Sequence, residues 1–340
     1  MDHQEPAAVA LAPAEGAHRD PTRSAALAIA GAAVLWGSMG PIATLYPRAS
    51  VLAVGSWRLV IGALALVTAV SVGRRGWTSW RRADLATAVP GALAVAAYSA
   101  LYFPAVQLSG VATATVVSIG AAPLLSGATR ALSGGRLTRH WLAGTTVAVV
   151  GMCLVVLPGS HDSANWLGIL LAVLAAAAYA WQAHTIERLA PRHGPIETVA
   201  VLFTGAALVL LPVGIAGVGA VTAAPKAVIG LLYLGLFTTA LAYGSFAFGV
   251  PHVGAPAAVS LSLLEPVAAT ALAALIAQQI PTVIQVTGVA TTLAGLGWLS
   301  RRSPGKTQAA SRHRDRPATR ATARTDHRPG PNRPSEHPPT

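Results

Sequence analysis

The sequence predicts an all-α integral membrane protein, with ten transmembrane helices arranged as two inverted five-helix repeats around a central cavity. Three observations lead to this prediction: an apolar composition, a series of apolar runs of membrane-spanning length, and an internal repeat. Of the 340 residues, 53% are hydrophobic and 11% are charged, whereas about 25% are charged in an ordinary soluble domain. The bilayer is therefore the expected solvent for most of the chain.

Ten apolar runs follow one another with short interruptions, each near the roughly 20 residues that a helix needs to cross a bilayer. They are expected at residues 24–45, 51–72, 84–106, 110–132, 141–157, 166–186, 196–217, 225–248, 254–277 and 282–300. Charged, proline and glycine residues mark most of the boundaries. The first 20 residues lack the basic segment of a conventional signal peptide, so we expect the first run to be retained.

The basic residues predict the orientation of these helices, because Lys and Arg gather in short cytoplasmic loops. With the N-terminus inside, the basic residues on the cytoplasmic side before the C-terminal tail are Arg19, Arg23, Arg74, Arg75, Arg81, Arg82, Arg130, Arg136, Arg139, Arg188 and Arg192. The opposite side holds only Arg48 and Lys226, and Arg58 lies within the second run. We therefore expect a multi-pass protein of the plasma (inner) membrane with both termini in the cytoplasm.

Polar tails are expected at both ends, at residues 1–23 and 301–340. The C-terminal tail holds ten basic and three acidic residues, many prolines and almost no apolar side chains, so it is predicted to be disordered. Attraction to anionic lipids is one interpretation of its charge, and an unselected charged tail is another. Nucleic-acid binding is disfavoured, because the tail lacks interleaved aromatic residues and has no folded reader beside it.

An internal repeat relates the two halves of the chain at an offset of 143 or 144 residues. The matched pairs are Leu45 with Leu189, Pro47 with Pro191, Gly110 with Gly254, Pro123 with Pro266, Thr138 with Thr282, and Gly144 with Gly288. The predicted repeats cover residues 24–158 and 164–300. Because each repeat contains five spans, an odd number, the second must enter the membrane in the opposite direction, an arrangement that recurs in secondary transporters.

Four stretches carry a resemblance to a known family: LWGSMGPIATLYP, AYAWQAHTIERL, GVATATVVSIGAAPLL and GAPAAVSLSLLEPVAA. They resemble the two EamA-type halves of the drug/metabolite transporter superfamily, over residues 24–300. The resemblance implies ten helices, a central cavity, and movement of small metabolites such as amino acids or of drug-like compounds, usually outward. Members often carry Gly-Glu at the ends of the fourth and ninth helices, where this chain has Gly134-Gly135 and Gln278-Gln279, so no role of those acids is carried over.

Asp84 and Glu197 stand at predicted helix starts, where an acid suits the positive end of the helix dipole. Away from the helix ends, two charged residues lie within the predicted spans, where a charge costs about 2.5 to 3.5 kcal/mol on insertion scales. Arg58 is about two turns from the outer end of its helix, so we expect an anchor that reaches the interface. Glu265 precedes Pro266, which frees the carbonyl of Ser262 and is expected to kink the helix there. Glu265 is predicted either to bind a substrate ammonium or carry a coupling proton, since loss of water favours a neutral carboxyl group, or to fix helix packing.

The cavity is predicted from polar and aromatic side chains at mid-depth. On the ninth helix Ala258, Ser262, Glu265 and Ala269 share one face, and Thr115, Ser118 and Ala122 form the matching stripe on the fourth. The full set of candidate substrate-binding residues is Trp36, Ser38, Tyr98, Tyr102, Ser118, Tyr179, Trp181, Tyr243, Ser262 and Glu265, with Glu265 also the coupling candidate. For any one ring, ordinary helix packing is the alternative.

Small residues four apart occur in the fifth and tenth helices, Gly144 with Ala148 and Gly288 with Thr292. They suit close helix contact either within one molecule or in a homodimer, and the pattern does not decide between a monomer and a dimer.

The sequence favours a secondary transporter that exports a small metabolite or drug-like molecule by alternating access. An importer is the alternative, and a membrane-embedded enzyme is less favoured, because the sequence contains no H-E-x-x-H, no G-x-S-x-G and no pair of carboxylates within the spans. A phosphate-binding G-x-x-x-x-G-K-[ST] loop is also absent, which disfavours a primary pump. We expect no catalytic residue, metal or cofactor; the expected partners are a small-molecule substrate, the lipid bilayer and, as one option, protons.

Overall fold

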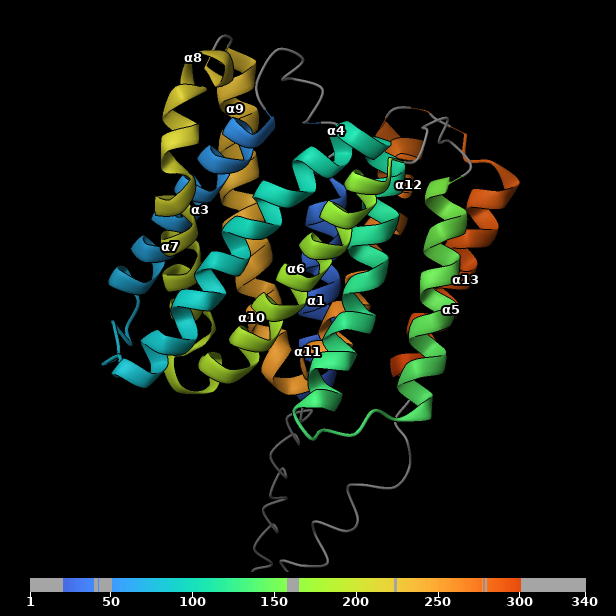
Figure 1. Cartoon of the computed structure of the whole chain (residues 1–340), viewed down its shortest axis with the longest axis horizontal. Coiled ribbons are helices and arrows are strands. Elements are labelled where there is room, and N and C mark those ends of the chain that lie inside the picture. The colour runs from blue at the N-terminus through green and yellow to red at the C-terminus, as the bar shows by residue number, and fades with distance from the viewer. Residues whose placement is uncertain are drawn as a thin grey trace, which may run out of the picture. The chain divides into compact units, whose positions relative to one another are not determined.

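The computed structural model describes residues 21–39, 42, 51–157, 165–222, 225–276, 278 and 280–300. Within these residues every regular element is helical (Figure 1). The elements are α1 (Pro21–Gly37), α3 (Val51–Val72), α4 (Arg82–Leu132), α5 (Arg139–Val156), α6 (Trp166–His193), α7 (Pro195–Ala216), α8 (Val218–Val221), α9 (Pro225–Tyr233), the π-helix η2 (Leu234–Leu241), α10 (Ala242–Val253), α11 (Ala255–Leu261), α12 (Leu264–Ile276) and α13 (Val283–Ser300). The expectations for residues 1–20 and 301–340, and those for Leu45, Pro47, Arg48 and Gln279, lie outside the described residues.

Seven helical segments are long and apolar enough to cross a membrane, so the protein is a multi-pass membrane protein. They are Val51–Val72, Arg82–Leu132, Arg139–Val156, Trp166–His193, Pro195–Ala216, Pro225–Val253 and Ala255–Ile276, and Val283–Leu299 is a shorter apolar helix. Large apolar side chains of these helices, such as Leu64 and Leu93, are well exposed, as expected for helices that face lipid.

The helix α4 contains two of the predicted spans in its 51 residues. Gly110 interrupts it with φ 75° and ψ 159°, a backbone conformation that a side chain disfavours. In Figure 1 the cyan first half of α4 rises and the green second half descends, with the reversal at the top. Gly254, the predicted repeat partner of Gly110, has φ 85° and ψ 149° and joins α10 to α11 at the bottom of the same view.

The predicted ninth span is broken immediately before Glu265. Helix α11 ends at Leu261, α12 begins at Leu264, and the two residues between them form a turn. Pro266 was expected to free the carbonyl of Ser262; in the structure that oxygen accepts a hydrogen bond from the backbone N–H of Glu265 at 2.9 Å. The carboxylate therefore stands in the first turn of α12, beside an irregular backbone.

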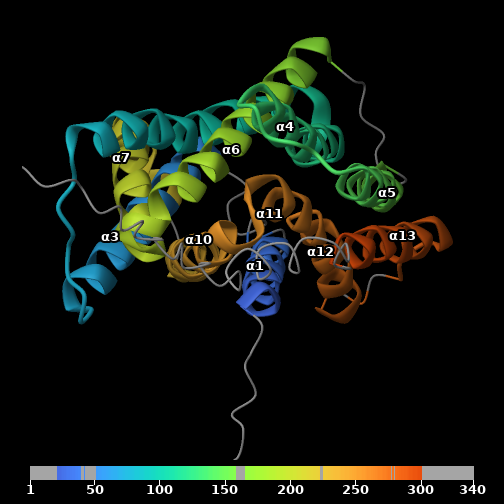
Figure 2. The same cartoon turned by 90° about the horizontal axis from the view of Figure 1, so that it is seen from below.

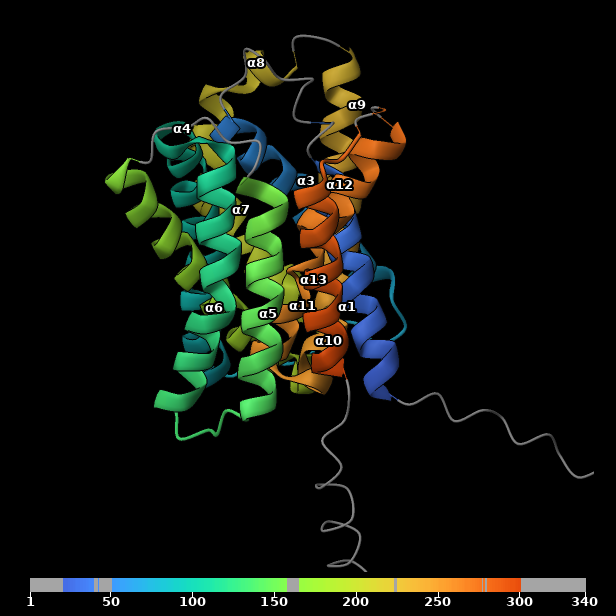
Figure 3. The same ribbon diagram turned by 90° about the vertical axis from the view of Figure 1, so that its right-hand side faces the viewer.

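The helices pack in pairs that bring distant parts of the sequence together. The most extensive contacts join α4 to α6, α5 to α13, and α3 to α7, while α1 lies against both α10 and α12 (Figures 2 and 3). The main buried cluster draws on α1, α3, α4, α6, α7, α10 and α11. Its centre therefore lies between helices from both halves of the chain.

The small residues of α5 and α13 make a close contact within one molecule. A Cβ added at Gly151 would meet the backbone nitrogen of Thr292, and one at Gly295 would lie 2.5 Å from the backbone nitrogen of Ala148. Figure 3 shows the two helices side by side. The small residues of α5 and α13 thus make the predicted close helix contact within one molecule.

Candidate functional site

A small cavity lies among the central helices and collects most of the predicted aromatic residues. It is lined by Trp36, Met39, Arg58, Tyr98, Ile119, Tyr179, Tyr243, Ser262 and Glu265. These residues come from α1 and the residues just after it, α3, both halves of α4, α6, α10, the 262–263 turn and α12. The cavity has a volume of about 40 Å³, which holds a few water molecules and is well below the roughly 300 to 1,000 Å³ of a small-molecule site.

Trp36 occupies the centre of an aromatic cluster. Its ring centroid lies 4.8 Å from that of Tyr243 and 5.6 Å from that of Phe246, and it meets Tyr179 edge-on at 6.4 Å. The indole Nε1 donates a 3.0 Å hydrogen bond to the carbonyl oxygen of Thr238. That carbonyl belongs to η2, and π-helical turns occur frequently at functional sites. The hydrogen bond fixes the orientation of the ring at the cavity.

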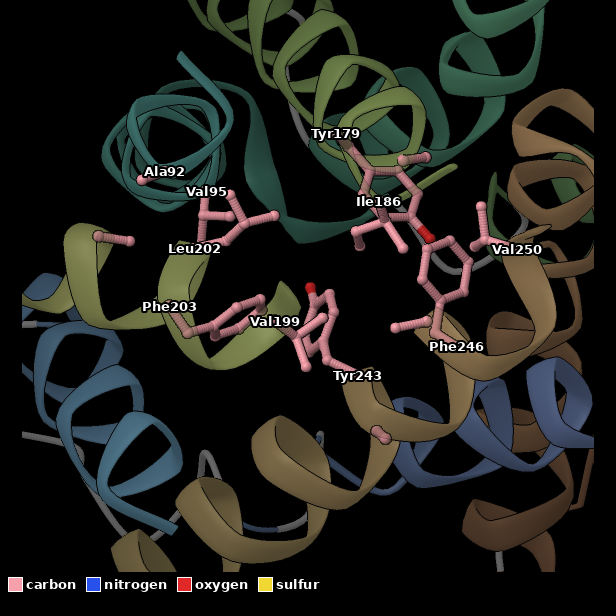
Figure 4. Close-up of a cluster of buried hydrophobic side chains, with 14 of the residues drawn as sticks. Ala92, Val95, Tyr179, Ile186, Val199, Leu202, Phe203, Tyr243, Phe246 and Val250 are labelled. Carbon is pink, nitrogen blue, oxygen red and sulfur yellow. The ribbon is translucent and has the colours of Figure 1, made fainter. Parts of the chain in front are cut away.

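The tyrosines continue this cluster across α4 and α6. Tyr98 and Tyr102 stack one turn apart, with ring centroids 5.6 Å apart and an interplanar angle of 5°, and Tyr98 also lies 5.8 Å from Tyr179. The hydroxyl groups of Tyr179 and Ser262 are hydrogen-bonded at 2.7 Å, which ties α6 to the break between α11 and α12. Figure 4 shows Tyr179 and Tyr243 together with Phe246 in the buried cluster.

A basic and an acidic side chain, Arg58 and Glu265, line the same cavity. The side chain of Arg58 is 8% exposed, and its Nη1 lies 4.0 Å from Sδ of Met39. Among the described residues, neither charged group has an oppositely charged partner within 4.0 Å. The prediction that Arg58 anchors the helix at the membrane interface is wrong, because its guanidinium turns inward to the cavity.

Close approach of α1 to α12 places Trp36 beside the acid. A Cβ at Gly37 would lie 2.8 Å from the carbonyl oxygen of Glu265 and 2.8 Å from the backbone nitrogen of Ala269. A side chain at this position would push the two helices apart. Gly37 therefore sets the distance between the aromatic cluster and the carboxylate.

The cavity contains six of the predicted site residues: Trp36, Tyr98, Tyr179, Tyr243, Ser262 and Glu265. Tyr102 stacks behind Tyr98 and shares a 2.9 Å hydrogen bond with Thr115, while the buried Ser118 donates to the carbonyl of Ala114. Ser38 hydrogen-bonds to Tyr233 at 2.6 Å.

Trp181 does not line the cavity, because its side chain is 50% exposed on the outer surface. It stands two residues after the cavity residue Tyr179, about 200° around a helix with 3.6 residues per turn. The two rings therefore face opposite sides of α6.

Three lining residues were not among the candidates. Arg58 could have been found from the sequence, because it is a charged residue within an apolar span, but depth alone suggests an anchor at the interface. Met39 and Ile119 resemble many other apolar residues of this sequence, so no pattern marked them out.

Two polar networks connect the helix ends at the bottom of Figure 1. In the first, Oε1 of Glu197 accepts hydrogen bonds from the backbone N–H of Thr78 at 3.0 Å, from the Thr78 hydroxyl at 2.8 Å and from the indole of Trp80 at 2.6 Å. Trp80 stacks on His193, with ring centroids 3.9 Å apart. Arg192 donates to Oδ1 of Asp84 at 3.0 Å. Beyond their fit to the helix dipoles, Asp84 thus links α4 to α6, and Glu197 links the loop before α4 to α7.

The second network joins the end of α4 to the end of α6. Arg130 pairs with Glu187 at 2.8 Å, and Nδ1 of His184 lies 3.3 Å from the other carboxylate oxygen. Nε2 of His184 lies 3.0 Å from the carbonyl oxygen of Ser126. With the first network, this one holds the helices together at that end of the molecule.

A bundle of membrane-spanning helices around a small aromatic cavity with two opposite charges is the architecture of a membrane transporter. The family model of the EamA-like transporter family matches residues 23–157 and 166–301. The chain belongs to this family, which confirms the resemblance found in the sequence. It is accordingly a transporter and not an enzyme.

Curated relatives carry transporter names. The chain is 32% identical over 271 residues to "Uncharacterized transporter YwfM" of Bacillus subtilis (strain 168), covering 78% of this chain and 90% of that protein. It is 28% identical to "Probable terminal-alkyne amino-acid exporter" of Streptantibioticus cattleyicolor, over 75% of this chain and 85% of the relative. A "Probable amino-acid metabolite efflux pump" of Salmonella typhimurium (strain LT2) is 30% identical over 47% of this chain and 58% of its own length.

A solved crystal structure of a protein superimposes on this fold. The TM-score is 0.71 at 20% identity, and the match covers 81% of this chain and 98% of the other. The fold is therefore one that has been observed experimentally.

Proposed function

We propose that this protein is a secondary transporter that exports a small metabolite, an amino acid or a related compound, by alternating access. The observation that carries the proposal is the cavity, which is lined from both halves of the chain by aromatic rings, one cation and one anion. The names of two relatives, an amino-acid exporter and an amino-acid metabolite efflux pump, support the direction and the substrate class. Import of a small metabolite is the alternative.

We propose ten transmembrane helices in two inverted repeats. At about 1.5 Å per residue, the 51 residues of α4 are more than twice as long as a bilayer core of about 30 Å is thick, so the reversal at Gly110 favours two spans. The apolar helices α1 and α13, of 17 and 18 residues, supply two more. Gly110 and Gly254 adopt closely similar backbone angles at opposite ends of the bundle, which suits an inverted relation between the repeats.

We place both termini in the cytoplasm, at the end of the bundle that carries the two polar networks. The excess of basic residues supports this orientation, since Arg74, Arg81, Arg130 and Arg192 all lie at this end. A carboxylate–guanidinium pair in each network then joins helices on the cytoplasmic side.

The described conformation is too tight to hold a metabolite in its cavity. Loading from the cytoplasm therefore requires the helices to separate, and the two polar networks are the contacts that must part at that end. We assign substrate contact to the six cavity residues of the predicted set, and proton exchange, where transport is coupled to protons, to Glu265. The substrate would be released on the opposite side of the membrane after the two networks have formed again, as alternating access requires.

The test is a growth assay that separates the two directions of transport. Cells that overexpress the protein are challenged with toxic amino-acid analogues and with cationic drugs, next to cells with empty vector. Export predicts resistance to amino-acid analogues, whereas import predicts sensitisation. Unchanged sensitivity to every compound, with the protein present in the membrane, would contradict the proposal.

A further inference from the structure

We infer that Arg58 and Glu265 form a two-point recognition site for zwitterionic substrates, in which Arg58 binds a carboxylate and Glu265 binds an ammonium group. This inference rests on the proposed function, and it assigns the chemical class of substrate to two particular side chains. It starts from the state of Arg58 in the structure.

Arg58 is a buried basic residue that forms no ion pair within 4.0 Å among the described residues. Its side chain is 8% exposed, its Nη1 contacts a methionine sulfur at 4.0 Å, and no carboxylate of the described residues lies within 4.0 Å. An arginine stays charged in proteins, and a buried charge is costly unless it is paired. A guanidinium also presents the fork of donors that matches a carboxylate. An anion that enters the cavity would therefore find a prepared partner.

Glu265 supplies the complementary half of the site. It lines the same cavity as Arg58, yet the two groups do not form an ion pair within 4.0 Å. Once the helices separate, a basic and an acidic side chain on one cavity suit a molecule that carries both a carboxylate and an ammonium group close together, as an α-amino acid does. The side chains of Trp36, Tyr179 and Tyr243 line the same cavity, and an aromatic ring attracts an ammonium group that lies over its face.

The surrounding contacts hold these groups in place before any substrate arrives. Trp36 is fixed by its hydrogen bond to Thr238, and Tyr179 is fixed by Ser262 in the break beside Glu265. Arg58 lies on α3, in the first half of the chain, and Glu265 lies on α12, in the second. A bound zwitterion would consequently contact both halves at once.

Each simpler class of ligand leaves one charge of the protein unpaired. A purely cationic molecule would pair with Glu265 but bring a second cation near Arg58, while a purely anionic molecule would do the opposite. A neutral molecule would pair with neither group. Because an unpaired buried charge is unfavourable, the site selects molecules with both charges.

The inference is tested with three ligands that share one side chain and differ in their charged groups. L-Phenylalanine is the zwitterion, L-phenylalaninamide lacks the carboxylate, and N-acetyl-L-phenylalanine lacks the ammonium group. Binding of tritiated L-phenylalanine to the full chain in lipid nanodiscs is measured, with the two derivatives as competitors. We expect the zwitterion to bind about 30-fold more tightly than either derivative, the effect of one hydrogen bond to a charged group.

Two variants assign the charges to residues. In Arg58→Gln the preference for phenylalanine over its amide should fall to near onefold, while the preference over the N-acetyl derivative remains. In Glu265→Gln the pattern should be reversed. Arg75→Gln, which removes an exposed cation from the loop after α3, is the matched control and should keep both preferences.

Several results would overturn the inference. One is equal binding of the zwitterion and its derivatives by the unaltered protein, a comparison that needs no variant to fold. Another is an equal loss of affinity for all three ligands in both variants, which would indicate a structural role. Absence of binding by L-phenylalanine, L-leucine and L-threonine would also overturn it, whereas resistance to cationic drugs in the growth assay would still support export.

Discussion

Replacement of Glu197 by alanine should loosen the loop between α3 and α4 by a predictable amount. This side chain is 4% exposed in the first turn of α7, and one of its oxygen atoms accepts three hydrogen bonds from Thr78 and Trp80. The loop has no regular secondary structure between residues 76 and 81. These hydrogen bonds, together with the stacking of Trp80 on His193, hold it against the helix ends.

The size of the effect follows from the bonds that are lost. A hydrogen bond contributes about 1 kcal/mol net, because the freed groups can hydrogen-bond to water once the loop moves away. Loss of three such bonds in Glu197→Ala should therefore lower the free energy of local opening by about 3 kcal/mol. Since about 1.4 kcal/mol corresponds to a tenfold change, the open population of the loop should rise about 150-fold.

Hydrogen exchange followed by mass spectrometry measures this population directly. Within the peptide that covers residues 73–81, the amide of Thr78, which donates to Glu197, should exchange about 150-fold faster in Glu197→Ala than in the unaltered protein, while peptides from α5 and α13 should exchange at their former rate. Glu197→Gln keeps a carbonyl oxygen as acceptor and is the matched control, with a much smaller acceleration expected. Equal protection of the loop in Glu197→Ala and the unaltered protein would refute the role of these hydrogen bonds.

Three further substitutions test other parts of the structure. Gly110→Ala places a side chain at φ 75° and should lower the unfolding free energy in detergent by about 1 to 2 kcal/mol, measured as a lower midpoint in a urea titration. Gly151→Leu should force α5 away from Thr292 on α13 and lower the thermal midpoint sharply, whereas Val150→Leu on the exposed face of α5 should leave it unchanged. Glu187→Gln should lower the unfolding free energy by about 1 to 3 kcal/mol, because this carboxylate is 23% exposed and contacts both Arg130 and His184; an unchanged midpoint in the same urea titration would contradict this.

The positions of the helices along the chain could be predicted from hydropathy. The run at 51–72 coincides with α3, and the run at 225–248 lies within the segment of α9, η2 and α10. The sequence did not predict that eight residues of this segment form a π-helix, because hydropathy does not distinguish an α-helix from a π-helix. The carbonyl that holds Trp36 belongs to those residues, so this contact could not be predicted either.

The direction in which side chains point was harder to predict than their depth. A helix in a membrane is apolar on its lipid face and on its packed face alike, so the contrast that marks the buried face of a soluble helix is weak. For this reason Trp181 was grouped with Tyr179, although the two rings point to opposite sides of α6. Arg58 was assigned to the interface from its depth alone, although its direction around α3 leads to the cavity.

Neither charge of the cavity has a charged counterpart in the other half of the chain. Under the proposed repeat, Arg58 corresponds to Leu202 and Glu265 to Ala122, and both of these counterparts are fully buried apolar residues. Two identical halves would place the same charge twice in a shared cavity, where like charges repel. A chain whose halves have diverged can place one cation and one anion there instead. The repeated helices then account for the cavity and its movement, while the two unmatched residues account for its selectivity toward a molecule that is itself charged differently at its two ends.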